Sequence, residues 1–261
     1  MKKILISIIV IVAMGFAPAP EDAKTIIYKT FTINKMAGSE AISQLTIKDD
    51  KGRERKRKTA IASKLYDDGM TEKKIIRFLE PADVKGTSML TFDYREKDDD
   101  MWIYLPALRK TRRIVSSEKG KSFMGSEFSN ADMVMPTIDD FTYKMLKESD
   151  MVGDIECWNI EMTSKDDDIA DEYGYLSRKV WIGKKDYVIR QAKIYDIDGE
   201  LLKEMTVKEV KMVDEKNKKS VPTHMEVVNV QNGRSSTMKM DKIVFSPDVK
   251  DEYFTVSYLE K

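Results

Sequence analysis

The chain has 261 residues, of which 34% are charged and 41% hydrophobic, and its 45 basic side chains balance its 45 acidic ones. A chain of this size can bury a core without a disulfide or metal, and its neutral charge argues against a surface that follows nucleic-acid phosphates. With one histidine, His224, and one cysteine, Cys157, it can form neither an intrachain disulfide nor a Cys/His zinc site. We therefore expect no cofactor, no metal and no nucleic-acid partner.

The N-terminal residues predict export. Met1-Lys2-Lys3 precede an uncharged apolar run, Ile4 to Phe16, and the small residues Ala17-Pro18-Ala19-Pro20 follow. This pattern is typical of a secretory signal peptide, because the uncharged run is shorter than the ~20 residues that span a bilayer. We predict a signal peptide over residues 1–23, cut between residues 17 and 24, and a periplasmic mature protein. An uncleaved N-terminal anchor is the alternative.

The rest of the chain has the pattern of one sheet-rich domain. Residues 24–37 carry apolar side chains partly at helical spacing before Gly38, which predicts a short helix. Beyond it, runs that alternate apolar and polar residues are separated by pairs such as Asp198-Gly199 and Asn232-Gly233. Such alternation with Asp-Gly and Asn-Gly turns predicts antiparallel hairpins. We expect a strand over 141–148, a turn at 153–154, and a single α+β, mainly β domain over 24–261.

Several residue clusters that could carry chemistry have simpler interpretations. The aspartates at 98–100 and 166–168 lack the spacing of a calcium loop, and the segment 196–199 is expected to be a hairpin turn. His224 has no accompanying nucleophile motif, and Cys157, beside Trp158, is expected to be a buried apolar residue. We therefore predict no catalytic residues and a protein that is not an enzyme.

Two further patterns are typical of binding surfaces. The basic cluster Arg53 to Lys58 is either a solvated hairpin rim or a docking site, in which Arg53, Arg55 and Arg57 meet anionic headgroups or an acidic partner. The run Met101 to Leu105 is apolar on both faces of the strand it would form. Residues 120–135, which we call the lid segment, are rich in methionine and contain glycine, as a lid over a lipid-sized cavity would need.

Ordered motifs between Arg77 and Met133 carry a family resemblance. They read Arg77-Phe-Leu-Glu-Pro-Ala-Asp-Val-Lys-Gly-Thr87, Asp99-Asp-Met-Trp-Ile-Tyr-Leu-Pro-Ala-Leu108, Arg112-Arg-Ile114 and Phe123-Met-Gly-Ser126. In this order they resemble the outer-membrane lipoprotein-sorting protein family, a branch of the LolA/LolB-like lipoprotein-carrier superfamily. Relatives then usually read Asp-Phe-(Thr/Ser)-Tyr-Glu-Asp, whereas this chain has Glu127-Phe-Ser-Asn-Ala-Asp132.

The resemblance implies a strongly curved antiparallel sheet, a half-barrel, with a few helices that plug its concave face over an apolar cavity. It implies a carrier of lipid or lipoprotein acyl chains for transport to the outer membrane, working with an inner-membrane transporter of the resistance–nodulation–division type. We expect the protein to be a monomer. The residues we predict to line the cavity are Leu90, Phe92, Trp102 and Tyr104, with Trp102 and Tyr104 on the concave side. Those we predict to form the lid are Phe123, Met124, Gly125, Phe128 and Met133.

Two other functions stay open on the same residues. One is a periplasmic sensor or interaction module on the same fold, which regulates a transporter or an envelope stress response. The other is a hydrolase of envelope lipids, which the single histidine and the missing nucleophile motif disfavour.

Overall fold

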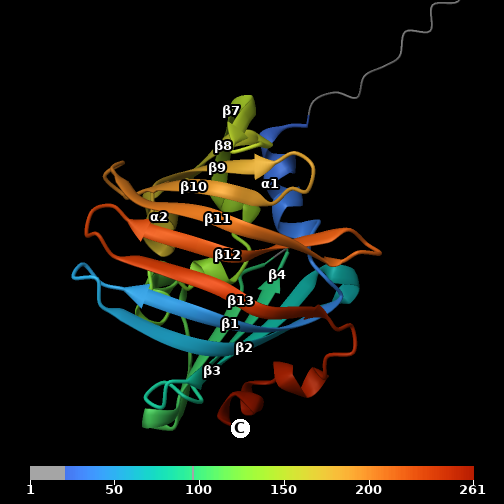
Figure 1. Cartoon of the computed structure of the whole chain (residues 1–261), viewed down its shortest axis with the longest axis vertical. Helices are drawn as coiled ribbons and strands as arrows, with labels where there is room; N and C mark the ends of the chain where they lie inside the picture. The colour runs from blue at the N-terminus through green and yellow to red at the C-terminus, as the bar shows by residue number, and fades with distance from the viewer. Residues whose placement is uncertain (1–20, 96) are drawn as a thin grey trace, which may run out of the picture.

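The computed structural model describes residues 21–95 and 97–261, so the apolar run of the predicted signal peptide lies outside the described residues. The described chain forms one 13-stranded antiparallel sheet and two α-helices (Figure 1). The helices are α1 (Ala23–Thr32) and α2 (Asp167–Tyr173). The strands are β1 (Gly38–Lys48), β2 (Glu54–Tyr66), β3 (Thr71–Glu80), β4 (Ser88–Tyr94), β5 (Asp100–Leu105), β6 (Lys110–Arg113), β7 (Phe141–Val152), β8 (Ile155–Ser164), β9 (Ser177–Gly183), β10 (Ile189–Tyr195), β11 (Leu201–Asp214), β12 (Lys219–Asn229) and β13 (Ser235–Phe245).

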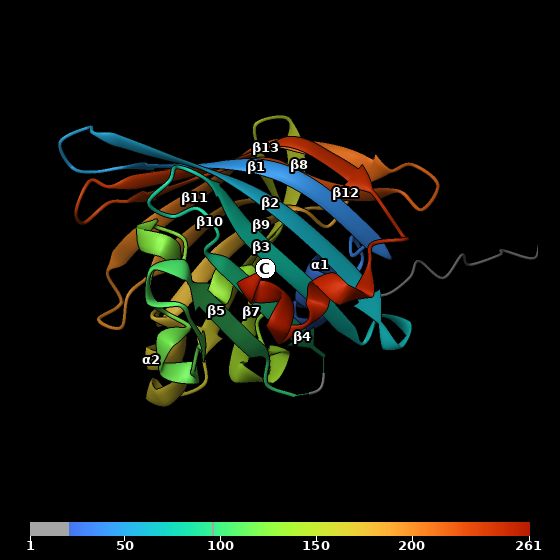
Figure 2. The ribbon, with the colours of Figure 1, turned by 90° about the horizontal axis from the view of Figure 1, so that it is seen from below.

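The order of the strands explains why a long segment must cross the sheet. The order is β6-β5-β4-β3-β2-β1-β13-β12-β11-β10-β9-β8-β7, so successive hairpins lead from β1 to one edge and return from the other edge to β13. The connection between β6 and β7, residues 114–140, therefore runs from one edge to the other. Figure 2 shows the sheet arching over α2 and this connection. The predicted curved antiparallel sheet with few helices is confirmed.

Both faces of the sheet carry apolar clusters, because side chains alternate along each strand. On the concave inner face, residues such as Leu45, Met89 and Met101 pack with Phe123 and Phe128 of the lid segment. On the convex outer face, another cluster is covered by residues 246–261, which we call the strap. The strap contributes Phe254 and Leu259, which are only 2% and 1% exposed. The strap lies against β4 and β5 (Figure 2).

Helix α1 is shorter than predicted. It begins after Asp22, whose carboxylate accepts a hydrogen bond from the Thr25 amide at 3.0 Å, and it ends at Thr32 rather than near residue 37. The reason is that Asn34 serves tertiary contacts: its amide nitrogen donates to the Asp186 carbonyl at 2.7 Å and its oxygen accepts from the Ser220 amide at 3.0 Å. Ile26 and Ile27 are fully buried and fix the helix on the inner face, in the cluster of β8 and β9.

Helix α2 was not predicted, although its signals are present in the sequence. Asp166 caps its N-terminus by accepting from the Ile169 amide at 2.9 Å, and Gly174, with φ 76°, ends it. Gly120 of the lid segment packs on that end, since a Cβ there would lie 2.7 Å from the Gly174 nitrogen. The predicted strand at 141–148 is part of β7, and the predicted turns at Gly153, Gly199 and Gly233 connect consecutive strands.

Candidate functional site

The lid segment fills the concave space where a cargo cavity was expected. Phe123 and Phe128 are 2% and 4% exposed, and the Phe123 ring lies 5.9 Å from the ring of Phe78 on β3. Met133 is also buried in this cluster, whereas Met124 is only partly buried and Gly125 is exposed. The segment consists of short 3₁₀ turns, and Met124 lies at its tip with φ 51°. The predicted lid residues are therefore brought together, on the inner face.

Glu127 anchors the lid segment to the far half of the sheet. Its carboxylate is almost fully buried, 3.1 Å from Nε of Arg234 and 3.9 Å from Nζ of Lys203. The carboxylate also accepts a hydrogen bond from Nδ2 of Asn229 at 3.1 Å. The backbone amide of Glu127 donates a hydrogen bond to Oγ of Ser236 at 2.9 Å. Four side chains, from β11, β12, β13 and the turn that precedes β13, thus hold this one position of the lid segment. The chain keeps an acidic residue at this position and lacks the family's aromatic and acidic residues at Asn130 and Ala131, and sequence analysis gave Glu127 no role.

A second set of anchors holds the other end of the lid segment. Nζ of Lys74 donates to the Met133 carbonyl at 3.1 Å, and the Met135 amide donates to Oδ2 of Asp93 at 3.3 Å. Lys35 pairs with Asp93 at 2.7 Å and with Glu72 at 3.1 Å, all three side chains being nearly buried. Burial opposes the charge of Lys35, but these two carboxylates raise its pKa above the usual value. Buried charges of this kind need their partners, which fixes the lid against β3 and β4.

Asp99 lies beside this charged cluster and makes the stability of the folded protein depend on pH. Burial, together with the carboxylate of Asp93, raises the pKa of Asp99 to about 7. Lys119 and Lys35 act in the opposite direction, and Oδ1 of Asp99 accepts from the Tyr94 amide at 3.1 Å. A carboxyl with a raised pKa binds its proton more tightly in the folded state, so the protein loses stability as pH rises from about 4 to about 7.

Asp99→Asn is therefore expected to raise the free energy of unfolding at pH 8 by roughly 1–3 kcal/mol, with no gain at pH 4. Asparagine cannot ionise but keeps the oxygen that accepts from Tyr94. Urea unfolding at a series of pH values measures the difference. Asp98→Asn, at the exposed neighbouring position, is the control and should leave the pH profile unchanged. A parallel shift of both variants at all pH values would contradict the assignment.

The residues predicted to line the cavity lie on the other face, which corrects their assignment. Leu90 is fully buried beneath the strap, and Phe92, Trp102 and Tyr104 pack around the same cluster. The predicted concave position of Trp102 and Tyr104 is wrong: their strand neighbours Met101 and Ile103 face the lid segment instead. An apolar strand needs cover on both faces, and the strap supplies the cover that the sequence left unassigned.

The basic cluster is divided between two environments. Nη1 of Arg57 donates to the Met124 carbonyl at the tip of the lid segment, and its guanidinium lies over the Phe78 ring. Arg53 pairs with Asp49 at 2.7 Å, and Arg55 is exposed. Headgroup docking by Arg53 and Arg55 remains a prediction, whereas Arg57 is a lid contact.

The remaining singled-out residues show no catalytic arrangement. Cys157 is buried, as predicted, and burial raises the pKa of its thiol. His224 is paired in register with Lys239 and Glu209 on neighbouring strands. Within residues 21–95 and 97–261, no three His, Cys, Asp or Glu side chains gather in a way that could hold a metal ion. In the same part of the chain, no helix has the length and apolar character needed to cross a membrane.

Comparisons with known proteins agree with this architecture. A family model described as "Uncharacterized protein" matches residues 70–261. A DUF1329 family protein from Desulfovibrio piger superposes with a TM-score of 0.82 at 29% identity, over 91% of this chain and 97% of its own. A domain from Vibrio parahaemolyticus described as an outer-membrane lipoprotein-sorting protein domain superposes with a TM-score of 0.82 at 26% identity, over 92% of this chain and 98% of its own.

A LolA superfamily protein from Nitrosomonas europaea shares the fold at 18% identity, with a TM-score of 0.67 over 90% of this chain and 98% of that one. No curated protein matches the chain in sequence. The ordered motifs between Arg77 and Met133, the family model and the shared architecture lead to one conclusion. The chain belongs to the family whose model matches residues 70–261, and it shares its fold with the outer-membrane lipoprotein-sorting domain and the LolA superfamily protein.

Proposed function

We propose that the protein is a periplasmic carrier that binds lipid or lipoprotein acyl chains on the inner face of its sheet. The observation that supports this most is the lid segment: an apolar, methionine-containing piece of chain occupies the concave face of a sheet shared with a lipoprotein-sorting domain. In this proposal the lid lifts off the inner face, an acyl chain takes the place of its buried side chains, and the lid then covers the bound chain. An inner-membrane transporter of the resistance–nodulation–division type would load or receive the cargo.

The energies of the lid and of the cargo are of similar size. An acyl chain gains roughly 0.8 kcal/mol for each buried CH₂, so a sixteen-carbon chain gains on the order of 10 kcal/mol. The lid buries Phe123, Phe128, Met133 and Val134. At roughly 1.5–3 kcal/mol for each side chain, their release costs a comparable amount. An exchange of this kind is nearly balanced, which allows a carrier to release its cargo as well as bind it.

Met124 provides the test, because Phe128 is too deeply buried for a charged substitution to leave the fold intact. Met124→Asp places a carboxylate at the partly buried tip of the lid, where an acyl chain would meet it. We expect it to raise the dissociation constant for a fluorescent lipopeptide with palmitoyl chains at least tenfold, or about 1.4 kcal/mol. Fluorescence titration of delipidated protein measures the change.

Met212→Asp is the matched control, since Met212 on β11 is 54% exposed. It should bind the lipopeptide as the parent does. If the parent protein binds no lipopeptide but co-purifies with a transporter, the interaction-module alternative replaces the carrier. Equal binding by the Met124 variant and the parent would contradict the placement of the cargo beneath the lid.

A further inference from the structure

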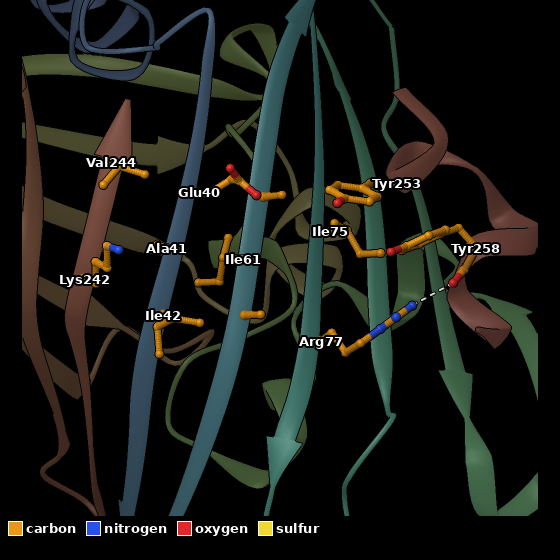
Figure 3. Close-up of a pocket in the computed structure, with 12 residues that line it drawn as sticks. Glu40, Ala41, Ile42, Ile61, Ile75, Arg77, Lys242, Val244, Tyr253 and Tyr258 are labelled. Carbon is orange, nitrogen blue, oxygen red and sulfur yellow. Dashed lines mark hydrogen bonds between the residues drawn. The ribbon is translucent and has the colours of Figure 1, made fainter. Parts of the chain in front are cut away.

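A groove on the outer face of the sheet lies beside the strap (Figure 3). It has a volume of about 360 Å³, within the range of roughly 300–1,000 Å³ that is usual for ligand sites. The strap supplies one wall through Tyr253 and Tyr258, and β13 lies at the opposite side. This groove is separated from the lid segment by the thickness of the sheet, so it is a site distinct from the inner face.

The floor of the groove is aliphatic. It is formed by Ile42, Ala60, Ala62 and Ile75, which occupy successive outward positions of β1, β2 and β3. Ala60 lies directly between Ile42 and Arg77 in the strand register, and Ala62 is paired with Ile75. Two alanines on the middle strand leave a trough between the larger neighbours. A trough of this shape fits a single extended aliphatic chain.

The rim of the groove carries cationic groups. Figure 3 shows Arg77 on the side of the strap and Lys242 on the side of β13. Arg77 is held in place: its Nη2 donates to the Tyr258 carbonyl at 2.7 Å and its Nε donates to Oγ of Ser88 at 3.1 Å. These bonds leave the hydrogens of Nη1 for a ligand. The acidic residue that lines the groove, Glu40, already accepts from Oγ of Ser246 at 3.0 Å.

An aliphatic floor beside a positioned guanidinium suits one class of ligand. We propose that the outer groove binds a single-chain amphiphile with an anionic head, whose chain lies along Ala60 and Ala62 and whose head accepts hydrogen bonds from Arg77. The guanidinium is a charged donor, and its hydrogen bonds to a carboxylate or phosphate are stronger than those between neutral groups. The shared chemistry belongs both to a free fatty acid and to a lysophospholipid.

The test uses delipidated full-length protein and dansyl-undecanoic acid. Ala60→Phe fills the floor of the trough, and it should raise the dissociation constant of this probe at least tenfold. Arg77→Gln should weaken binding of the acid about tenfold, because a charge-assisted hydrogen bond is lost. It should leave binding of the matched uncharged alcohol unchanged. Arg77→Lys, which keeps the charge, should retain most of the binding.

Three controls make the result specific. Lys239→Gln removes an exposed cation from β13 outside the groove and should not change binding. Met124→Asp should not affect this probe either, which separates the outer groove from the inner face. Displacement by palmitate or by lysophosphatidylglycerol identifies the source of the ligand, and displacement by neither would overturn the proposal. Unchanged binding by Ala60→Phe, or loss of binding in Met124→Asp alone, would overturn it as well.

Discussion

Glu127→Gln is expected to loosen the lid segment and to increase the binding of acyl chains. The substitution removes a buried negative charge and leaves Arg234 and Lys203 without their carboxylate partner. Breaking a buried ion pair costs about 3–5 kcal/mol, and because Arg234 is partly exposed we expect a loss of about 2–3 kcal/mol in the free energy of unfolding. The amide of residue 127, bonded to Ser236, should exchange its hydrogen faster.

Loosening of the lid should appear directly in binding, because the apparent affinity of a ligand scales with the population of the competent state. A shift of about 1.4 kcal/mol toward the open lid tightens lipopeptide binding about tenfold. Glu148→Gln, at an exposed position of β7, is the control and should change neither stability nor binding. Faster exchange in the lid without tighter binding would show that the lid does not cover the cargo site.

The second large effect is expected at the strap. Replacing Phe254 and Leu259 together with alanine should lower the free energy of unfolding by about 5 kcal/mol or more, since each buried side chain contributes about 2–5 kcal/mol. The same variant should shift the emission of Trp102 to longer wavelength, because Trp102 packs in the cluster that the strap covers. Trp158 and Trp181 are replaced by phenylalanine in parent and variant alike, so that the emission reports Trp102 alone.

Val256→Ala is the matched control for the strap. Val256 belongs to the same segment but is 38% exposed, so its truncation should change stability by less than about 0.5 kcal/mol. If the double variant is as stable as the parent, the strap does not cover the outer face in solution.

The fold could be predicted from the sequence because its signals are local. Alternating runs separated by Asp-Gly and Asn-Gly pairs define hairpins whichever face is buried, and consecutive hairpins produce one antiparallel sheet. The motif at residues 166–174 could have been recognised in the same way, since an aspartate cap and a terminal glycine mark α2.

The assignment of faces could not be predicted, because it depends on distant segments. The strand from Met101 to Leu105 is apolar on both sides, and a period of two fits either orientation. What decides it is the strap, which begins more than a hundred residues later and covers Trp102 and Tyr104. The same holds for Glu127, whose partners lie 76 to 109 residues away. A single acidic residue in an apolar loop carries no local sign of buried cationic partners.

The central claim is that cargo binding requires the lid segment to leave the inner face, and a reversible lock tests it most directly. The 2.9 Å bond from the Glu127 amide to Oγ of Ser236 brings the two Cα atoms within about 7 Å, close to the span of a disulfide. The variant Glu127→Cys with Ser236→Cys joins lid and sheet when oxidised and frees the lid when reduced, because the anchoring carboxylate is gone. Each single cysteine variant serves as a redox control.

The decisive measurement is titration of this double variant with the fluorescent lipopeptide, before and after reduction. We predict no detectable binding in the oxidised form and binding at least as tight as that of the parent in the reduced form. Equal binding in the two redox states would contradict the claim that the lid must move.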